Sequence, residues 1–565
     1  MTGMARQVSG KQWFPGFLVA WLLLNLFQAA FTELDPDEAY YWLYSTDLDW
    51  GYFDHPPMVA LLIRAGTLLF PGELGVRFFF VLLQPLSFYF VWLLAGKPSG
   101  KPDVFTLAGL LAAIPILGAY GFIATPDGPL LFFTALFLWL YREFLEKGGW
   151  LFTLLLGITM AALLYSKYHG VLLIFFILLS NLSLLRKPSF YLASILGFIL
   201  FLPHLYWQYE NGFPSFLYHL QGRDDLYKLK YTTTYLLNQL VIFSPFLFPM
   251  LIWVLWKRRA AGAMGRAYRF LLYGFWLFFF YTSFKGHVEP QWTVALSFPI
   301  ALMLFGESRH NPGFGRWARI FSLVTFVLLL PARLELAFNW TGMKSDFHRR
   351  AWAYELQERA EGYPVLFQNS YRDVSKYSFY TGEQAYAFSD IEYRPNQFDI
   401  WDKERGLQDK RVLLVAQNNW KCENCEKVEL TQKSFKIQWL DSLQAAGKVQ
   451  CLLPDNLGGR WSVGPQAAFP VKFYNPYPFD IGLRKGTLPL LAKGVFLRKG
   501  VPCSYSLISL EGAPLALPAG DTAVFEARFS VPDSLSGPYQ FGIGLSRDAL
   551  PPDIKSRLVD VEVVE

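Results

Sequence analysis

Hydrophobic positions are crowded into the first 332 residues, where long apolar runs alternate with short polar loops. A membrane-spanning helix needs roughly 20 apolar residues. On this criterion eleven runs predict spans, at 14–31, 77–96, 104–122, 128–141, 150–166, 170–185, 189–205, 233–256, 270–284, 290–305 and 317–332. The run 57–70 is bounded by prolines and contains Arg64, which favours an interfacial helix. The pattern therefore predicts a polytopic α-helical membrane protein with a membrane domain over residues 1–332.

Beyond residue 332 the pattern is that of a soluble protein. Residues 333–460 mix helical periodicity with short apolar strands, such as 412–415, which predicts an α/β domain. Residues 461–565 alternate in short segments separated by Pro and Gly, which is typical of a β-sandwich. Two domains are thus expected after the membrane part.

The basic residues predict the orientation of the chain. Cytoplasmic loops of membrane proteins carry an excess of Lys and Arg. Basic clusters such as Lys257-Arg258-Arg259 fall in alternate loops, together with Arg6 and Lys11 at the N-terminus, whereas the loop 32–56 has seven acids and no Lys or Arg. A cytoplasmic N-terminus follows, the first span is expected to be a retained anchor, and an odd number of spans places residues 333–565 outside.

Composition agrees with a membrane protein and limits the partners. The chain is 53% hydrophobic and 17% charged, against about 25% charged residues in a soluble domain. The net charge of +6 is small, and its basic residues sit between apolar runs, so nucleic-acid binding is not expected. The four cysteines, Cys422, Cys425, Cys451 and Cys503, all follow residue 332, where an oxidising compartment favours disulfides over a zinc site.

The loops predicted to lie outside hold most of the candidate chemistry. Asp35-Pro36-Asp37-Glu38 predicts a helix start, with Asp35 as N-cap and Glu38 at the third position, so capping is an alternative role for Glu38. Asp37, Tyr40, Tyr41 and Tyr44 then share one helix face, and a carboxylate beside three phenols suits a hydroxyl-rich substrate. Glu33, Asp47 and Asp49 are expected to be solvated loop residues.

Several of these loop segments resemble one family in the same order. They are Asp37-Glu38-Ala39-Tyr40-Tyr41-Trp42, Tyr52-Phe53-Asp54-His55-Pro56-Pro57, Ala124-Thr125-Pro126-Asp127-Gly128-Pro129, Tyr165-Ser166-Lys167-Tyr168 and the run 283–292. Together they are similar to bacterial polyprenyl-phosphate-dependent glycosyltransferases of the GT-C superfamily, in the branch of the protein O-mannosyltransferases and the lipid A aminoarabinose transferase. The resemblance covers most of residues 30–300.

The resemblance implies the transfer of a sugar from a polyprenyl phosphate carrier to an acceptor at the external face of a bacterial inner membrane, with inversion. It implies Asp37 as the base or acceptor-orienting group, Glu38 as second choice, and Asp127 as a further acid of the site. Asp37 and Asp127 are also candidate ligands of a divalent cation, the one cofactor considered. Candidates for substrate binding are Tyr40, Tyr41, His55, Lys167, Tyr168, Arg223, Lys285 and His287. Among these, the candidates for binding the lipid phosphate are His55, Lys167, Arg223 and Lys285. Relatives carry Lys at the His55 position.

Each candidate has a structural alternative. Pro126-Asp127-Gly128 is also a turn signal, Lys167 and Lys285 could be lysines that reach the membrane interface, and His287 with Glu289 lacks a third metal partner. The alternative functions are a transporter, or a non-enzymatic membrane protein that displays a glycan-binding sandwich. The acceptor stays open among lipid A, a surface glycan and protein.

Overall fold

The computed structural model describes residues 13–220, 226–420, 424–465, 468–483, 485–511, 516–547 and 550–564. The chain forms two compact units, residues 1–348 and 349–565. Arg223 and Cys422 lie outside the described residues.

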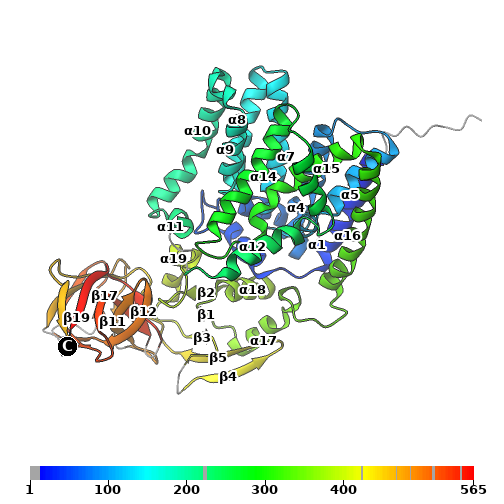
Figure 1. Cartoon of the computed structure of the whole chain (residues 1–565). Helices are drawn as coiled ribbons and strands as arrows, with labels where there is room; N and C mark the ends of the chain where they lie inside the picture. Colours follow the sequence, from blue (N-terminus) through cyan, green and yellow to red (C-terminus); the bar gives the residue numbers. More distant parts are fainter. Residues whose placement is uncertain are drawn as a thin grey trace, which may run out of the picture. The chain divides into compact units, whose positions relative to one another are not determined.

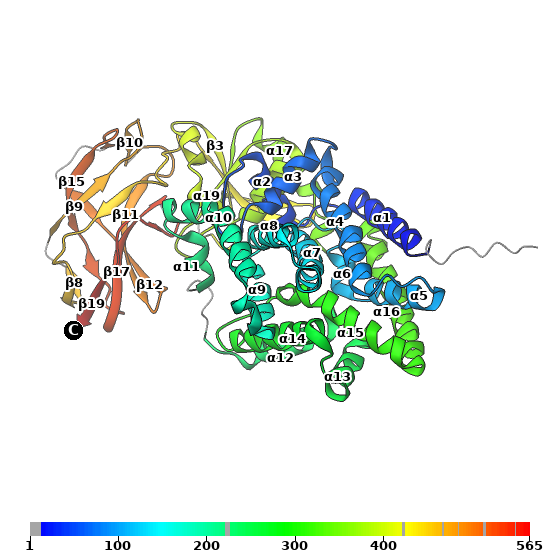
Figure 2. The same ribbon diagram turned by 90° about the horizontal axis from the view of Figure 1, so that it is seen from above.

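The first unit is helical. Its helices are α1 (Trp13–Phe31), α2 (Pro36–Thr46), α3 (Met58–Thr67), α4 (Gly72–Leu94), α5 (Lys101–Ala112), α6 (Pro115–Ala119), α7 (Asp127–Glu146), α8 (Trp150–Ser166), α9 (Gly170–Ser180), α10 (Pro188–Glu210), α11 (Pro214–Leu220), α12 (Leu229–Ile242), α13 (Leu247–Lys257), α14 (Gly262–Thr282), α15 (Ser297–His310) and α16 (Pro312–Phe338), with a 3₁₀ turn η3 (Pro290–Leu296) before α15. In Figure 1 the helices α8, α9, α10 and α14 run side by side. Figure 2 shows the same bundle from above, looking roughly down the helix axes.

Five of the described helices, α1, α4, α7, α10 and α16, are long and apolar enough to cross a membrane. The pair α12 and α13, bent by 97°, would make a sixth if it is one span. The polytopic membrane fold is therefore confirmed. The other predicted spans coincide with α5 and α6, α8, α9, α14, and η3 with α15, which are shorter or less apolar, so the number of eleven crossings stays a prediction. Helix α3 forms where an interfacial helix was expected.

The second unit begins with a mixed sheet. Strands β1 (Val365–Gln368), β2 (Ala385–Phe388), β3 (Val412–Ala416), β4 (Glu426–Leu430) and β5 (Lys433–Leu440) take the order β2-β1-β3-β5-β4, parallel over β2-β1-β3 and antiparallel beyond. Helices α17 (Ala351–Ala360) and α18 (Tyr371–Thr381) flank the first strand, and α19 (Gln397–Ile400) and η5 (Lys403–Leu407) follow the second. The sheet is buried on both sides around Leu366, Leu414 and Trp420, as the α/β pattern predicted.

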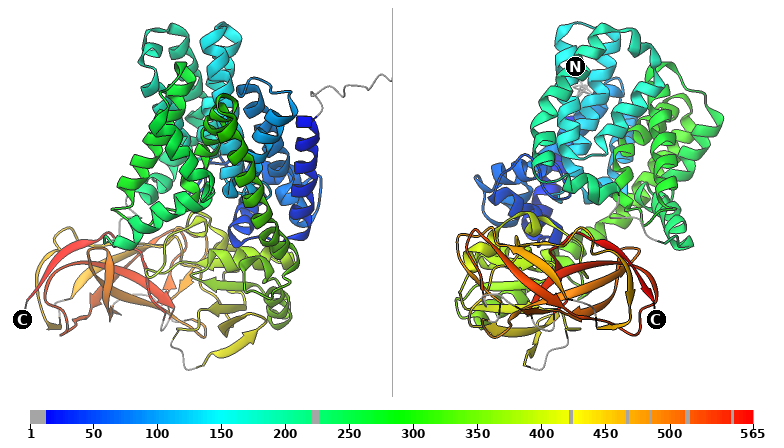
Figure 3. Two further views of the ribbon diagram at one scale, coloured as in Figure 1. Left: turned by 45° about the vertical axis from the view of Figure 1, so that its right-hand side comes forward. Right: turned by 90° about the vertical axis from the view of Figure 1, so that its left-hand side faces the viewer.

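The rest of the second unit is a two-sheet sandwich. One sheet joins β12 (Val501–Leu507), β11 (Leu490–Arg498), β17 (Gly537–Arg547), β19 (Val559–Val564) and β7 (Gly459–Ser462), with β18 (Asp553–Ile554) beside β17. The other joins β13 (Ser509–Glu511), β15 (Thr522–Arg528), β9 (Phe469–Tyr474) and β6 (Gln450–Leu452). Short pairs β10 (Ile481–Gly482) with β14 (Ala516–Leu517) and β16 (Ser530–Val531) with β8 (Gly464–Pro465) complete it. Inward residues of both sheets form one core, and Figure 3 shows the two layers.

The cysteines follow the prediction only in part. Cys425 is disulfide-bonded, whereas Cys451 and Cys503 are free thiols. Disulfide formation was therefore the wrong expectation for these two. Cys451 points into the sandwich core, and burial raises the pKa of its thiol to about 12, so it behaves as a small apolar residue.

Candidate active site

Helix α2 starts as its sequence predicts. The Asp35 carboxylate accepts a hydrogen bond from the Asp37 backbone N–H at 2.9 Å, the Asp35 backbone N–H donates to Glu38 Oε2 at 3.0 Å, and Pro36 occupies the first turn. This capping box fixes the direction of the helix. It leaves Asp37 half-buried on the first turn of α2.

Glu38 has a structural role. Its side chain is fully buried and forms an ion pair with Arg77 of α4, whose Nε and Nη2 donate to Glu38 Oε1 and Oε2 at 2.7 and 2.5 Å. The Ala124 backbone N–H also donates to Oε1, at 2.7 Å. With the bond from Asp35, four donors fill the roughly four acceptor positions of a carboxylate. This geometry does not favour the proposed second choice of Glu38 as base, because no lone pair is left for a substrate proton.

Asp127 and Lys167 form a second buried ion pair. Asp127 is the first residue of α7, Lys167 follows the end of α8, and Lys167 Nζ donates to Asp127 Oδ1 and Oδ2 at 2.7 and 2.9 Å. The side chains are 4% and 6% exposed. Asp127 also lies in a turn, because the Gly128 backbone N–H donates to the Thr125 carbonyl at 3.1 Å. The buried ion pair does not favour Lys167 as an interfacial lysine. A cation at Asp127 would face this ammonium, and the described residues hold no group of three His, Cys, Asp or Glu suited to a metal, so a metal role for Asp127 is not favoured.

Tyr120, which directly follows α6, interacts electrostatically with acidic residues of separate loops, namely Asp127, Asp35, Asp37 and Glu289. The turn η3, which follows Glu289, packs against α6 and α7. Tyr120 was missed because it lies in a run interpreted as a span, and Glu289 was considered only as a possible metal ligand beside His287.

The tyrosines of α2 mostly pack against one another. Tyr40 and Tyr44 are buried with ring centroids 4.6 Å apart, and Tyr44 stacks on Tyr52 at 4.1 Å. Burial raises the pKa of Tyr44 well above its usual range, so it stays a neutral donor to Asp54 Oδ1 at 2.8 Å. Tyr41 lies edge-on to the His55 ring at 5.5 Å. The structure thus places His55 next to Tyr41 of α2, the helix that also carries Asp37 and Glu38.

The end of the first loop is bound to α10 and α11. Trp207 Nε1 donates to Asp49 Oδ2 at 2.6 Å, and the Ser215 hydroxyl donates to the Tyr52 carbonyl at 2.9 Å. His204 Nδ1 lies 2.8 Å from the Trp50 carbonyl, which can only accept, so Nδ1 carries the proton. A Cβ at Gly51 would lie 2.4 Å from the Trp207 ring, so only glycine fits there. Asp49 is exposed, as expected of a solvated loop residue, and it also accepts this hydrogen bond from Trp207.

The remaining candidates lie at the edges of this region. Tyr168 binds His204 Nε2 through its hydroxyl at 2.9 Å and so supports the loop. Lys285 is exposed with Nζ 5.9 Å from the Tyr281 ring centre, and His287 is exposed 3.7 Å from Glu289. No described contact joins Lys285 or His287 to Asp127 or Lys167.

Parts of the chain are similar in sequence to known proteins. A family model described as dolichyl-phosphate-mannose-protein mannosyltransferase matches residues 54–207. Lipid A galacturonosyltransferase RgtD of Rhizobium johnstonii is 24% identical over 332 residues, which are 56% of this chain and 65% of RgtD, so the match spans just under two thirds of that relative.

Solved structures are similar over most of their length. The apo crystal structure of ArnT from Cupriavidus metallidurans superposes with a TM-score of 0.56 and 13% identity, covering 75% of this chain and 97% of ArnT. The same ArnT bound to undecaprenyl phosphate gives 0.54 and 15%, covering 75% and 98%. The resemblance predicted from the loop motifs is therefore confirmed, and the chain shares the fold of the ArnT structures.

Proposed function

We propose that the chain is a membrane glycosyltransferase that moves a sugar from a polyprenyl phosphate carrier to an acceptor at the external face of a bacterial inner membrane. The observation that carries the proposal is the group of Asp37, Asp127, Glu289, Tyr120 and Lys167, contributed by separate loops of this fold. Charged residues at membrane depth are expensive and usually functional. One of the two ArnT structures is bound to undecaprenyl phosphate, and RgtD is by its name a lipid A galacturonosyltransferase.

The chemistry needs a base at one side of the sugar and a cation at the other. In the proposed step an acceptor oxygen attacks C1 of the sugar, and the bond from C1 to the phosphate oxygen breaks with its electrons leaving on the polyprenyl phosphate. Asp37 takes the acceptor proton. A single displacement of this kind inverts the configuration at C1. A general base typically contributes about 10²–10⁴ in rate.

Lys167 is the proposed contact of the leaving phosphate. An ammonium has three N–H donors, and two of them are directed at Asp127. One donor is left for a phosphate oxygen, while the Asp127 carboxylate holds the ammonium in place. A preorganised donor of this type is worth on the order of 10²–10³ in rate. Lys285, His55 and Arg223 are secondary candidates for the carrier, with Arg223 outside the described residues.

The acceptor proposed is a glycolipid, because the curated relative is by its name a lipid A galacturonosyltransferase. Protein is the second candidate acceptor, because the family model that matches residues 54–207 is described as a protein mannosyltransferase. The transporter alternative is not favoured, since its substrate charges would lie in broken helices near the bilayer midplane, whereas the acidic residues here lie at helix ends. The non-enzymatic alternative leaves the loop residues without a role.

The test compares cells with and without the gene. Mass spectrometry of lipid A and other surface glycolipids should reveal one sugar mass that is lost on deletion and restored by the wild-type chain, by Asp47→Asn, but not by Asp37→Asn. Purified chain in nanodiscs with the undecaprenyl-phosphate-linked sugar should release undecaprenyl phosphate only when acceptor is present. An unchanged glycolipid and glycoprotein profile in the deletion strain would refute the proposal.

We also propose that the N-terminus is cytoplasmic and residues 349–565 are external, from the distribution of Lys and Arg. A reporter active only in the cytoplasm should be silent after residue 565 and active when inserted within 257–262. The opposite pattern would overturn the orientation and place the acidic site on the cytoplasmic face.

A further inference from the structure

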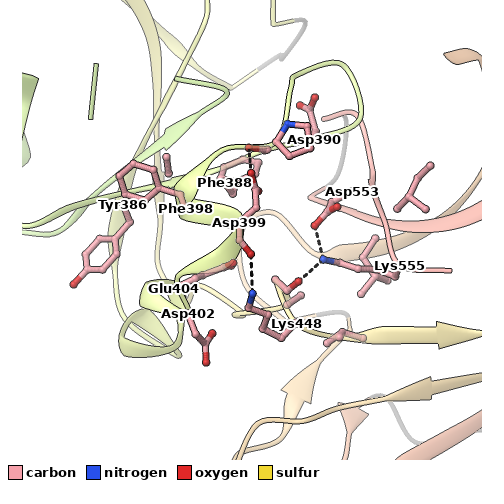
Figure 4. Close-up of a pocket in the computed structure, with 18 of the residues that line it drawn as sticks. Tyr386, Phe388, Asp390, Phe398, Asp399, Asp402, Glu404, Lys448, Asp553 and Lys555 are labelled. Carbon is pink, nitrogen blue, oxygen red and sulfur yellow. Dashed lines mark hydrogen bonds and ion pairs between the residues drawn. The ribbon is translucent and has the colours of Figure 1, made fainter. Parts of the chain in front are cut away.

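The second unit contains a cavity of about 600 Å³ between its mixed sheet and its sandwich. One wall comes from the end of β2, α19 and η5, and the other from the loop 446–450, β17 and β18 (Figure 4). Small-molecule sites commonly have volumes of about 300–1,000 Å³. The cavity is therefore large enough for a small polar ligand, and it belongs to neither of the ion pairs described above.

Hydrogen bonds to the backbone hold the cavity's lysines in place. Lys448 Nζ donates to the carbonyls of Asp399 and Ile400 at 2.7 and 3.1 Å, and Lys555 Nζ donates to the Gly447 carbonyl at 2.7 Å and to the Asp553 carboxylate. Lys448 has no carboxylate partner among the described residues, and one of its three donors is unused. It can therefore donate to a ligand without giving up a contact.

Asp399 presents an acceptor in the same cavity. Its Oδ2 accepts from the Asn396 backbone N–H at 2.6 Å and from the Ser389 hydroxyl at 3.0 Å. Its Oδ1 accepts no hydrogen bond from any residue that the structure describes. Burial, and then the nearby Asp553, raise the pKa of Asp399 to about 6, while Lys555 opposes this shift. At neutral pH the group is therefore mostly a carboxylate that can accept from a ligand hydroxyl.

Arg547 is a second polar group that the protein satisfies only in part. It is 9% exposed, its Nη2 donates to Glu404, and its guanidinium carbon lies 4.6 Å from the centre of the Phe388 ring. Its Nε is buried and has no hydrogen-bond partner among the described residues. A buried donor left unpaired costs free energy, and an acceptor oxygen of a ligand in the cavity would remove that cost.

The composition of the walls identifies the class of ligand. Five carboxylates (Asp390, Asp399, Asp402, Glu404, Asp553) and four cations (Lys403, Lys448, Arg547, Lys555) nearly balance, so the lining favours neither a strongly charged anion nor a strongly charged cation. The lining also holds six aromatic side chains, which are Tyr386, Phe388, Tyr393, Phe398, Trp401 and Tyr477. A ligand that is neutral, both donates and accepts hydrogen bonds, and has an apolar ring face matches this lining.

We propose that this cavity binds a neutral sugar unit of a glycan, with the Asp399 carboxylate and the Lys448 ammonium directed at its hydroxyl groups. In Figure 4 Asp399 from α19 and Lys448 from the loop 446–450 lie next to each other across the two walls, with Asp553 and Lys555 beside Lys448. The site is separate from the residues proposed for transfer, so it stands whether or not the chain transfers a sugar.

Binding can be measured on the full chain in nanodiscs by saturation-transfer NMR. The probes are methyl α-D-mannopyranoside, D-galactose and N-acetyl-D-glucosamine, with D-galacturonate as an anionic comparison. At least one neutral sugar should bind with millimolar affinity. Asp399→Asn and Asp402→Asn should each weaken that binding about tenfold or more, because a hydrogen bond to a charged group is lost.

Asp441→Asn is the matched control, because its carboxylate is 76% exposed and outside the cavity. It should bind like the wild type. Thermal unfolding of each variant identifies a loss of fold, and Asp402→Asn is informative if Asp399→Asn disturbs the cap of α19. The proposal fails if no neutral sugar binds, if galacturonate alone binds, or if both folded cavity variants bind like the wild type.

Discussion

Lys167 has two separable roles, as the partner of Asp127 and as the proposed contact of the lipid phosphate. A cycle of Lys167→Met, Asp127→Asn and the double variant distinguishes them. Both side chains are at most 6% exposed, and Nζ lies 2.7 and 2.9 Å from the two carboxylate oxygens. Removing one partner of such a pair leaves a buried charge and typically costs about 3–5 kcal/mol, whereas replacing both by neutral groups is often close to neutral.

Each single variant should therefore unfold at a clearly lower temperature in detergent, measured by fluorescence-detected size exclusion after heating. The double variant should regain most of the loss. The effect of truncating Lys167 on folding should thus depend on whether Asp127 is changed with it. Lys147→Met is the control, because its ion pair with Glu143 has a lysine that is 63% exposed, and such pairs contribute about 0–1 kcal/mol.

Sugar transfer should not recover with the fold. If Lys167 stabilises the leaving phosphate, the folded double variant should be slower than wild type by on the order of 10²–10³, measured as undecaprenyl phosphate released per enzyme. A double variant with wild-type stability and wild-type turnover would show that the ion pair is purely structural. Equal stability of the single and double variants would refute the account of the buried pair itself.

Three further outcomes are expected. Asp37→Asn should lower the rate of sugar transfer by at least roughly 100-fold with normal membrane insertion. Asp47→Asn changes an exposed acid of the same loop and should transfer sugar at close to the wild-type rate. An active Asp37→Asn enzyme would show that Asp37 is not the base. Glu38→Gln should reduce the amount of folded protein, because it unpairs the buried Arg77, and normal accumulation on size exclusion would contradict its structural role. Asp399→Asn should raise the unfolding temperature of the chain relative to wild type at pH 8, and this advantage should shrink towards pH 4.5. The pKa of Asp399 is about 6 in the folded chain, against about 3.9 for an aspartate in the unfolded chain. The ionised wild-type carboxyl therefore destabilises the fold above pH 6 and has no such effect below the unfolded-state pKa. A difference independent of pH would show that Asp399 does not titrate in this range.

Local signals in the sequence were sufficient for the elements but not for their partners. The start of α2 could be predicted because Asp35, Pro36 and Glu38 are within one turn of each other. Arg77 stands at the start of the predicted span 77–96, and nothing in a periodic pattern reveals that it reaches Glu38, 39 residues away. Its full burial is a tertiary property.

The same limit applies to the candidate site. Asp127 and Lys167 were both selected from the sequence, but their ion pair joins the start of α7 to the end of α8 and could not be read from either loop. Tyr120 was hidden in an apolar run, where aromatic residues usually pack or face lipid. Helix lengths could not be predicted from the hydrophobic pattern either. Breaks such as the one between α5 and α6 do not alter the hydrophobicity of the run.

The bonds between the first loop and α10 and α11 bear on the exchange of segments among related proteins. Asp49, Trp50 and Tyr52 depend on Trp207, His204 and Ser215, which lie more than 150 residues later. Substitutions at residues in contact are generally not additive. A chimera that receives residues 47–55 from a relative should therefore fold well only if residues 204–215 come from the same donor. The two segments are therefore expected to change together in evolution, although the bonded residues are 154 to 163 positions apart.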